Sequence, residues 1–102
     1  MILVQGSAQI HADDAGALRD AASWMIPATR GEEGCLHYAW GEDALTPGLF
    51  HVVERWRDEA AMQAHLASAH MARLGGVLGR LRVQALRIVA YDGANERVIL
   101  GG

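Results

Sequence analysis

Residues 49–70 read LFHVVERWRDEAAMQAHLASAH, and partway along they change from strand-forming to helix-forming composition. The segment 49–56 is rich in β-branched and aromatic side chains, so we expect a strand there. Asp58 then precedes an alanine-rich run and is suited to cap a helix that ends near Ala67. Ser68 is suited to cap a further segment. This stretch therefore predicts a strand followed by two helical segments.

The residues before this stretch predict one strand and one helix. Residues 2–10 alternate between apolar and polar side chains, as a half-buried strand does. Asp13 or Asp14 is positioned to cap the helix that follows. Pro27 should bend or end this helix in its last turn, because proline has no N–H for an internal hydrogen bond.

Two further strands complete the predicted order. CLHYAW at 35–40 is separated from the strand at 49–56 by turn residues, so the two should form a hairpin. RVQALRIVAY at 82–91 is the fourth strand, and residues 96–100 form a short extended tail. The order strand, helix, strand, strand, helix, strand predicts an α+β, ferredoxin-like split β-α-β fold, with helices on one face of an antiparallel sheet.

The amino-acid composition limits the class of protein and the kinds of chemical site that this chain can form. The 102 residues are 51% hydrophobic, which is typical of one folded domain, here with its core over 2–91. The chain has no lysine, so Schiff-base chemistry and a phosphate-loop lysine are excluded. The single cysteine excludes a disulfide framework and a cysteine zinc site within one chain. A formal charge of −3 without a basic stripe argues against nucleic acid and membranes as partners, and we expect a cytoplasmic protein.

The predicted fold leaves one face of the sheet without helices. This face would expose Val53 and other apolar side chains, and such a patch is typical of an interaction surface. Two copies stacked face to face would bury it, so we expect a homodimer.

Glu54 and Trp56 share one face of the strand at 49–56. A partly buried ion pair with an arginine is the favoured interpretation of Glu54, and the candidates are Arg30, Arg73 and Arg87. The alternative is a general base or a residue that orients a neighbouring histidine. Trp56 either closes the interface between helix and sheet or donates its indole N–H to a substrate oxygen.

Two histidines follow in the helical region. His65 lies on the apolar helix face that should meet the sheet opposite Glu54, where it is either a satisfied core residue or a functional base. His70 lies five residues further on and leaves that face in a continuous helix, although a break near Ser68 would return it. This spacing does not suit a pair of metal ligands, and no metal site is expected.

Three other features have structural interpretations. His37 and His51, on neighbouring hairpin strands, are interpreted as surface or interface residues. Cys35 is interpreted as a buried, inert thiol. LGGVLG at 74–79 has three glycines in a helical context and forms either a loose segment or a mobile lid.

TRGEEGCLHYAW at 29–40 and the stretch at 49–70 together resemble the antibiotic biosynthesis monooxygenase family, including its quinol-monooxygenase branch. The matching marks are T-R-x-E-x-G-C before the second strand, E-x-W-x-D at the end of the third, and A-x3-H-x4-H after it. The resemblance extends over residues 2–91. It implies a dimeric α+β barrel in which each protomer keeps a pocket between its sheet and its helices.

The resemblance also implies a monooxygenase that oxidises a small phenolic, anthrone or quinol substrate with molecular oxygen and no cofactor. His65 or His70 would be the base, and Trp56 would donate to an oxygen. Glu54 would orient the histidine. The residues expected to bind substrate are Val4, Gly6, Tyr38, Phe50, Val52, Met62, Leu66 and Leu74.

Departures from other branches of this family leave two alternatives. Haem-degrading relatives carry an asparagine and a haem-binding histidine where our alignment puts Gly6 and Gly75, so haem degradation is not expected. Other relatives isomerise a small phosphorylated signalling sugar with a similar histidine-bearing helix, and this alternative stays open. A non-catalytic dimeric barrel that only binds small molecules is the third possibility.

Overall fold

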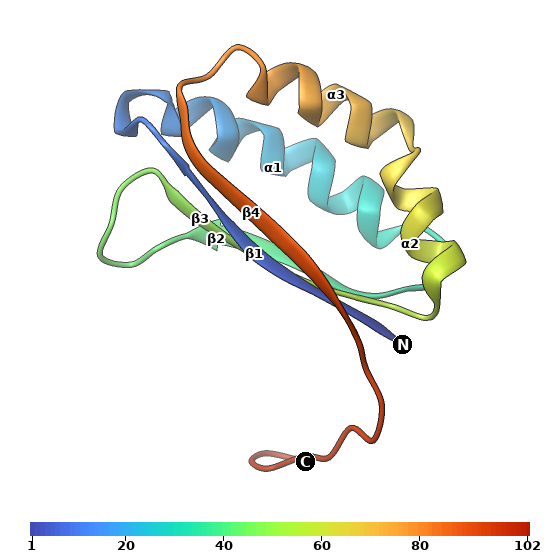
Figure 1. Cartoon of the computed structure of the whole chain (residues 1–102). Coiled ribbons are helices and arrows are strands. Elements are labelled where there is room, and N and C mark those ends of the chain that lie inside the picture. Colours follow the sequence, from blue (N-terminus) through green and yellow to red (C-terminus); the bar gives the residue numbers. More distant parts are fainter.

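The computed structural model describes residues 1–102 and has a single sheet with helices packed on one face (Figure 1). The strands are β1 (Ile2–Ile10), β2 (Cys35–Glu42), β3 (Leu49–Trp56) and β4 (Val83–Asp92), and the helices are η1 (Ala12–Asp14, a 3-10 turn), α1 (Ala15–Arg30), α2 (Glu59–Leu66) and α3 (Ala69–Leu78). The strands lie in the order β2-β3-β1-β4, and all neighbours are antiparallel. The expected α+β, ferredoxin-like fold is confirmed. No helix combines the length and the apolar character that a membrane crossing needs.

Two of the predicted helix caps are confirmed. Asp58 accepts the backbone N–H of Ala61 at 2.9 Å at the start of α2. Ser68 accepts the backbone N–H of Met71 at 3.2 Å at the start of α3. The Ser68 hydroxyl also donates to the carbonyl of His65 at 2.7 Å, so the same residue closes α2 and opens α3.

The start of α1 differs from expectation, whereas its end lies in the turn that contains Pro27, as expected. Asp14 precedes the helix, but its side chain makes no capping hydrogen bond. The carboxylate instead accepts two hydrogen bonds from the Arg82 guanidinium, at 3.0 and 3.1 Å, because the chain before β4 passes close by. Pro27 lies inside the helix, which continues to Arg30. The missing N–H of one proline therefore does not stop the last turn, whose end is fixed by the Gly31 backbone.

The inner side of the sheet carries two apolar clusters. One, which includes Ile10 and Phe50, lies against α1 and α3, and the other, which includes Tyr38 and Trp56, lies near the start of α2. The ring of His65 rests on the second cluster, with its centroid 4.8 Å from that of Trp56 and 5.7 Å from that of Tyr38. This packing fixes where α2 presents its histidine.

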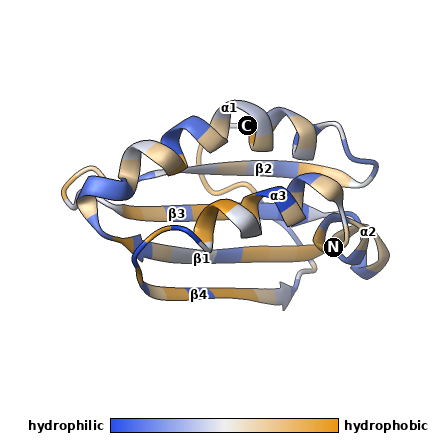
Figure 2. Ribbon diagram, turned by 90° about the horizontal axis from the view of Figure 1, so that it is seen from above, coloured by the Kyte–Doolittle hydropathy of each residue, from blue (hydrophilic) through white to orange (hydrophobic).

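Strand β4 lies outside the cover that the helices provide. Figure 2, seen from the helix side, shows the helices over the other strands and β4 free of them. Leu86 and Ile88 on this strand consequently remain about half exposed. β4 approaches β1 so closely that a Cβ on Gly6 would collide with the carbonyl oxygen of Arg87. Only glycine fits at this position of β1, beside β4.

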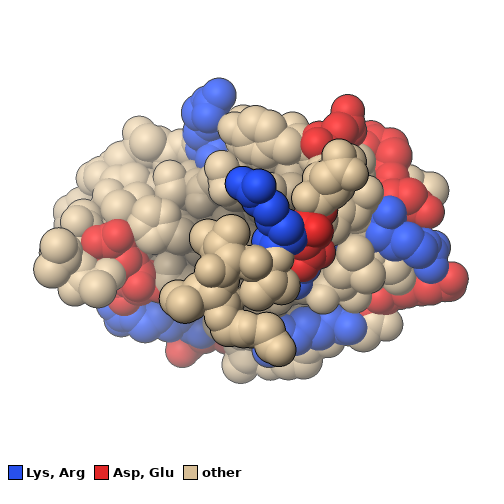
Figure 3. Space-filling view, turned by 90° about the horizontal axis from the view of Figure 1, so that it is seen from below, with Lys and Arg blue, Asp and Glu red and all other residues tan.

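The opposite face of the sheet carries no helix. Val53 is exposed there, as expected from the alternation in β3. Residues 93–102 form no helix or strand, and within them Glu96 lies 3.7 Å from Arg55 of β3. Figure 3 views this face and shows arginine and acidic side chains scattered over a mostly uncharged surface. The apolar side chains of this last segment, Val98, Ile99 and Leu100, are exposed.

Candidate functional site

A cavity of about 390 Å³ lies between the inner face of the sheet and α2 and α3, and it opens along β4. Its walls are mainly apolar, and the side chains on them include no arginine. Seven of the eight predicted substrate-binding residues line it, namely Val4, Tyr38, Phe50, Val52, Met62, Leu66 and Leu74. Gly6 does not, because its Cα faces the backbone of β4.

The four predicted catalytic residues fall into two groups. Glu54 and His65 line the cavity. Trp56 is fully buried, does not line the cavity, and donates its indole N–H to Glu54 Oε1 at 2.9 Å. The expectation that this N–H points at a substrate oxygen is therefore wrong, since the carboxylate already accepts it. His70 lies behind His65, outside the cavity lining.

Glu54 is a buried carboxyl group whose only basic neighbour is a histidine. Burial raises its pKa, against the opposite effect of the Trp56 hydrogen bond. The interpretation as an ion pair with an arginine is wrong, because no arginine lies within ion-pair distance of Glu54. Arg30 donates to the carbonyl of Tyr38 at 2.9 Å, and Arg73 stacks on Trp24 at 3.9 Å from the ring centroid. The nearest titratable nitrogen is His65 Nε2, 3.9 Å from Glu54 Oε1.

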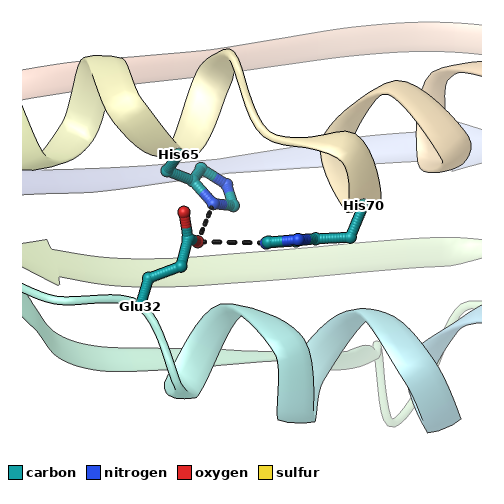
Figure 4. A group of neighbouring side chains, drawn as sticks. All are labelled: Glu32, His65 and His70. Carbon is teal, nitrogen blue, oxygen red and sulfur yellow. Dashed lines mark hydrogen bonds and ion pairs between the residues drawn. The ribbon is translucent and has the colours of Figure 1, made fainter.

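A second carboxylate, Glu32, joins the two histidines (Figure 4). Its Oε2 atom lies 2.7 Å from His65 Nδ1 and 3.1 Å from His70 Nε2. Glu32 stands in the turn between α1 and β2, and its backbone N–H donates to the carbonyl of Thr29 at 3.0 Å, which fixes the turn.

The break between α2 and α3 makes this arrangement possible. In one continuous helix, five residues would rotate His70 by about 140° away from His65. The capping by Ser68 restarts the helix instead, and both imidazoles reach the same carboxylate oxygen. The hydrogen bond to Glu32 assigns the ring proton of His65 to Nδ1. His65 Nε2 then carries a lone pair, and this atom faces Glu54 and the cavity.

Two residues of this site had no role in the sequence-based prediction. Glu32 is the glutamate of the T-R-x-E-x-G-C motif, and that motif was the only signal for it. Trp40 lines the cavity, and its indole N–H is buried without a hydrogen-bond partner. A signal was available for Trp40, because it lies two residues after Tyr38 and so shares its strand face. Trp40, not Trp56, is therefore the tryptophan that lines the cavity.

Of the two other candidate histidines, His51 lines the cavity, whereas His37 does not. His37 stands opposite Arg55, not His51, so the two histidines are not cross-strand neighbours. His51 binds Asp43 Oδ1 at 2.8 Å in the loop after β2. Burial raises the pKa of the Cys35 thiol, which favours the inert form.

One group of side chains has the donor set of a metal site. Glu32, His65 and His70 offer one oxygen and two nitrogens, all within 4.8 Å of one another. A set of two imidazoles and one carboxylate suits transition metals. The residues therefore fit such an ion chemically, although the sequence spacing predicted no metal site.

Comparisons with known proteins agree with one another. A family model described as antibiotic biosynthesis monooxygenase matches residues 1–74. The chain is 30% identical over 70 residues to YcnE of Bacillus subtilis, described as a candidate monooxygenase, covering 69% of this chain and 74% of that protein.

Solved structures give the same result over nearly the whole chain. A Deinococcus radiodurans protein, described as a candidate antibiotic biosynthesis monooxygenase, superposes with a TM-score of 0.91 at 35% identity, covering 99% of this chain and 100% of that one. Rv0793 from Mycobacterium tuberculosis gives a TM-score of 0.84 at 27% identity, covering 95% and 98%. The chain therefore belongs to the antibiotic biosynthesis monooxygenase family.

Proposed function

We propose that the protein is a cofactor-independent monooxygenase that oxidises a small phenolic, anthrone or quinol substrate with molecular oxygen. One observation carries the proposal. His65 lines an apolar cavity of about 390 Å³, and its Nδ1 is held by Glu32 at 2.7 Å, so that Nε2 is free to accept a proton. Membership of the family supports the class of reaction.

The chemistry needs a base, a place for an anion and a dry site. Triplet oxygen reacts poorly with closed-shell molecules, but a phenolate or enolate can transfer one electron to it. His65 Nε2 would take the proton from the substrate hydroxyl or carbon acid, and Glu32 would hold the resulting imidazolium as a positioning residue. One oxygen atom then enters the substrate, and the other leaves as water with two hydrogens from the substrate.

Trp40 and Glu54 have complementary roles in this scheme. The indole N–H of Trp40 is buried without a hydrogen-bond partner, and after a turn of the ring toward the cavity it would donate to the anionic oxygen of the substrate. Glu54 lines the same cavity 3.9 Å from His65 Nε2, where it would orient the histidine. The apolar walls offer few hydrogen bonds to water beside the reacting carbanion or phenolate, and bound substrate would cover the opening along β4.

The two alternative functions have less support. A phosphorylated sugar carries about two negative charges, and sites that bind phosphate use arginine, lysine or clustered backbone N–H groups. The cavity lining contains no arginine and the chain has no lysine. A purely binding protein would not need a base that is both buried and oriented by a carboxylate. Turnover without oxygen would favour the isomerase, and tight binding without turnover would favour the binding protein.

The proposal includes a homodimer. The exposed outer face of the sheet around Val53, together with the exposed apolar segment 98–100, would be buried by a second copy. Light scattering at micromolar concentration should then give about twice the chain mass of 11.0 kDa. A monomer at that concentration would remove the proposed burial of Val53.

The test is oxygen consumption with a panel of hydroquinones and anthrones, using chelator-treated protein. His65→Ala should lower kcat by about tenfold to a thousandfold, because it removes the base. His37→Ala, which removes an imidazole far from the cavity, is the matched control and should have little effect. Circular dichroism of His65→Ala confirms that it is folded. A folded His65→Ala protein with the wild-type rate would mean that His70 or a substrate-activated water is the base.

A further inference from the structure

We propose that Glu32, His65 and His70 bind one transition-metal dication of the Zn²⁺ type. This ion would inhibit the protein by coordinating the His65 imidazole, which is the proposed base. The binding half depends only on the geometry of the three side chains. The inhibitory half rests on the proposed function of His65. No other group of three potential ligands converges in the chain.

Metal binding requires side-chain movements of about 1 Å in this cluster. Glu32 Oε2 is 2.7 Å from His65 Nδ1 and 3.1 Å from His70 Nε2, and the three atoms lie within 4.8 Å of one another. Zinc bound tetrahedrally at its usual bond lengths of about 2.1 Å keeps its ligand atoms about 3.4 Å apart. The carboxylate oxygen must therefore withdraw from each nitrogen by less than about 1 Å, and the two imidazole nitrogens must approach each other by up to about 1.4 Å. Rotation of the Glu32 side chain in its turn and of the part-exposed His70 side chain can supply both movements.

Access and donor type indicate the class of ion. The side chains of Glu32 and His70 are 16% and 20% exposed, whereas that of His65 is 3% exposed. An ion can thus enter from the solvent side and keep a water in its fourth position. Two imidazole nitrogens favour Zn²⁺, Ni²⁺ or Cu²⁺ over Mg²⁺ and Ca²⁺, which prefer oxygen ligands.

Metal binding and the proposed base compete through one proton. In the metal-free protein, His65 donates its Nδ1–H to Glu32 and presents a lone pair at Nε2. A metal at Nδ1 needs the lone pair there, so the ring proton must move to Nε2. That atom lies 3.9 Å from Glu54 Oε1, a carboxyl oxygen able to accept the N–H after a small shift. With the ion bound, His65 presents a donor to the cavity and can no longer take a proton from the substrate.

Calorimetric titration of tag-free, chelator-treated protein with Zn²⁺ at neutral pH tests the binding half. We expect one ion per chain in the wild type and in the control His37→Ala, and at least about tenfold weaker binding in His70→Ala and Glu32→Ala. Mg²⁺ should not compete at the same concentration. The binding proposal is overturned if the wild type binds Zn²⁺ no more tightly than His70→Ala does.

Oxygen consumption with added Zn²⁺ tests the inhibitory half separately. Wild-type turnover should fall to half near the measured Kd and return with chelator, whereas the residual turnover of His70→Ala should need at least about tenfold more Zn²⁺. Stoichiometric Zn²⁺ binding without any loss of turnover would overturn the inhibitory half. If no quinol or anthrone is turned over by the metal-free wild type, the proposed function fails while the binding result stands.

Discussion

Glu32→Gln should destabilise the protein far more than the same change at the adjacent Glu33. Glu32 accepts hydrogen bonds from two imidazoles, whereas Glu33 is 89% exposed and lies 3.4 Å from Arg57 at the surface. A hydrogen bond to a charged group contributes about 1.5–3 kcal/mol, and a neutral one contributes about 1 kcal/mol. The glutamine oxygen can still accept one imidazole N–H as a neutral bond. With partial exposure of the cluster, we expect the free energy of unfolding to fall by about 2 kcal/mol.

For a domain of this size that loss corresponds to a Tm lower by about 10 °C. Glu33→Gln should change the free energy of unfolding by no more than about 0.5 kcal/mol, because exposed ion pairs contribute little. Differential scanning calorimetry of both variants, at equal protein concentration and with chelator present, measures the difference. Equal Tm values for the two variants would refute the view that Glu32 holds both histidines.

Two further predictions concern other carboxylates. Trp56→Phe removes the hydrogen-bond donor to the buried Glu54, and urea unfolding should show a free energy of unfolding lower by about 1–3 kcal/mol. Trp40→Phe removes an N–H that has no partner, so its free energy of unfolding should fall by less. A cost for Trp40→Phe as large as that for Trp56→Phe would contradict this assignment. Arg82 lowers the pKa of Asp14 to about 2, so this carboxylate stabilises the fold above its ordinary pKa of 3.8 and stops doing so as the pH falls toward about 2. The difference in Tm between the wild type and Asp14→Asn should therefore be largest near neutral pH and vanish as the pH approaches about 2. A difference that does not change with pH would exclude the Arg82 interaction as its cause.

The sequence predicted the elements well where the signal is local. Alternation over 2–10 and the capping residues Asp58 and Ser68 each act within a few positions, and the structure confirms all three. The cap at Asp14 was wrong because its carboxylate binds Arg82, 68 positions away in sequence. A short sequence pattern shows the residues that could accept a local cap, but it does not show that Arg82 competes for the same carboxylate.

The site was predictable only in part, for the same reason. Helical spacing correctly turned His65 toward the sheet, and strand alternation correctly turned Glu54 inward. Glu32 received no role, since its partners lie 33 and 38 positions further along the chain. The direction of the Trp56 N–H depends on a side-chain torsion, which alternation does not specify.

The joint at Ser68 also affects how this chain tolerates changes in length. In an uninterrupted helix, one inserted residue rotates everything downstream by about 100° and carries every later side chain off its face. Here α3 starts from its own cap, so an insertion after Ala67 would lengthen a linker and leave the phase of α3 unchanged. An insertion at this joint would therefore cost the hydrogen bond from Ser68 to His65 and shift His70 relative to Glu32, but it would leave the core-facing side of α3 in phase. A single deletion in α2 before His65 would instead turn His65 away from the cavity.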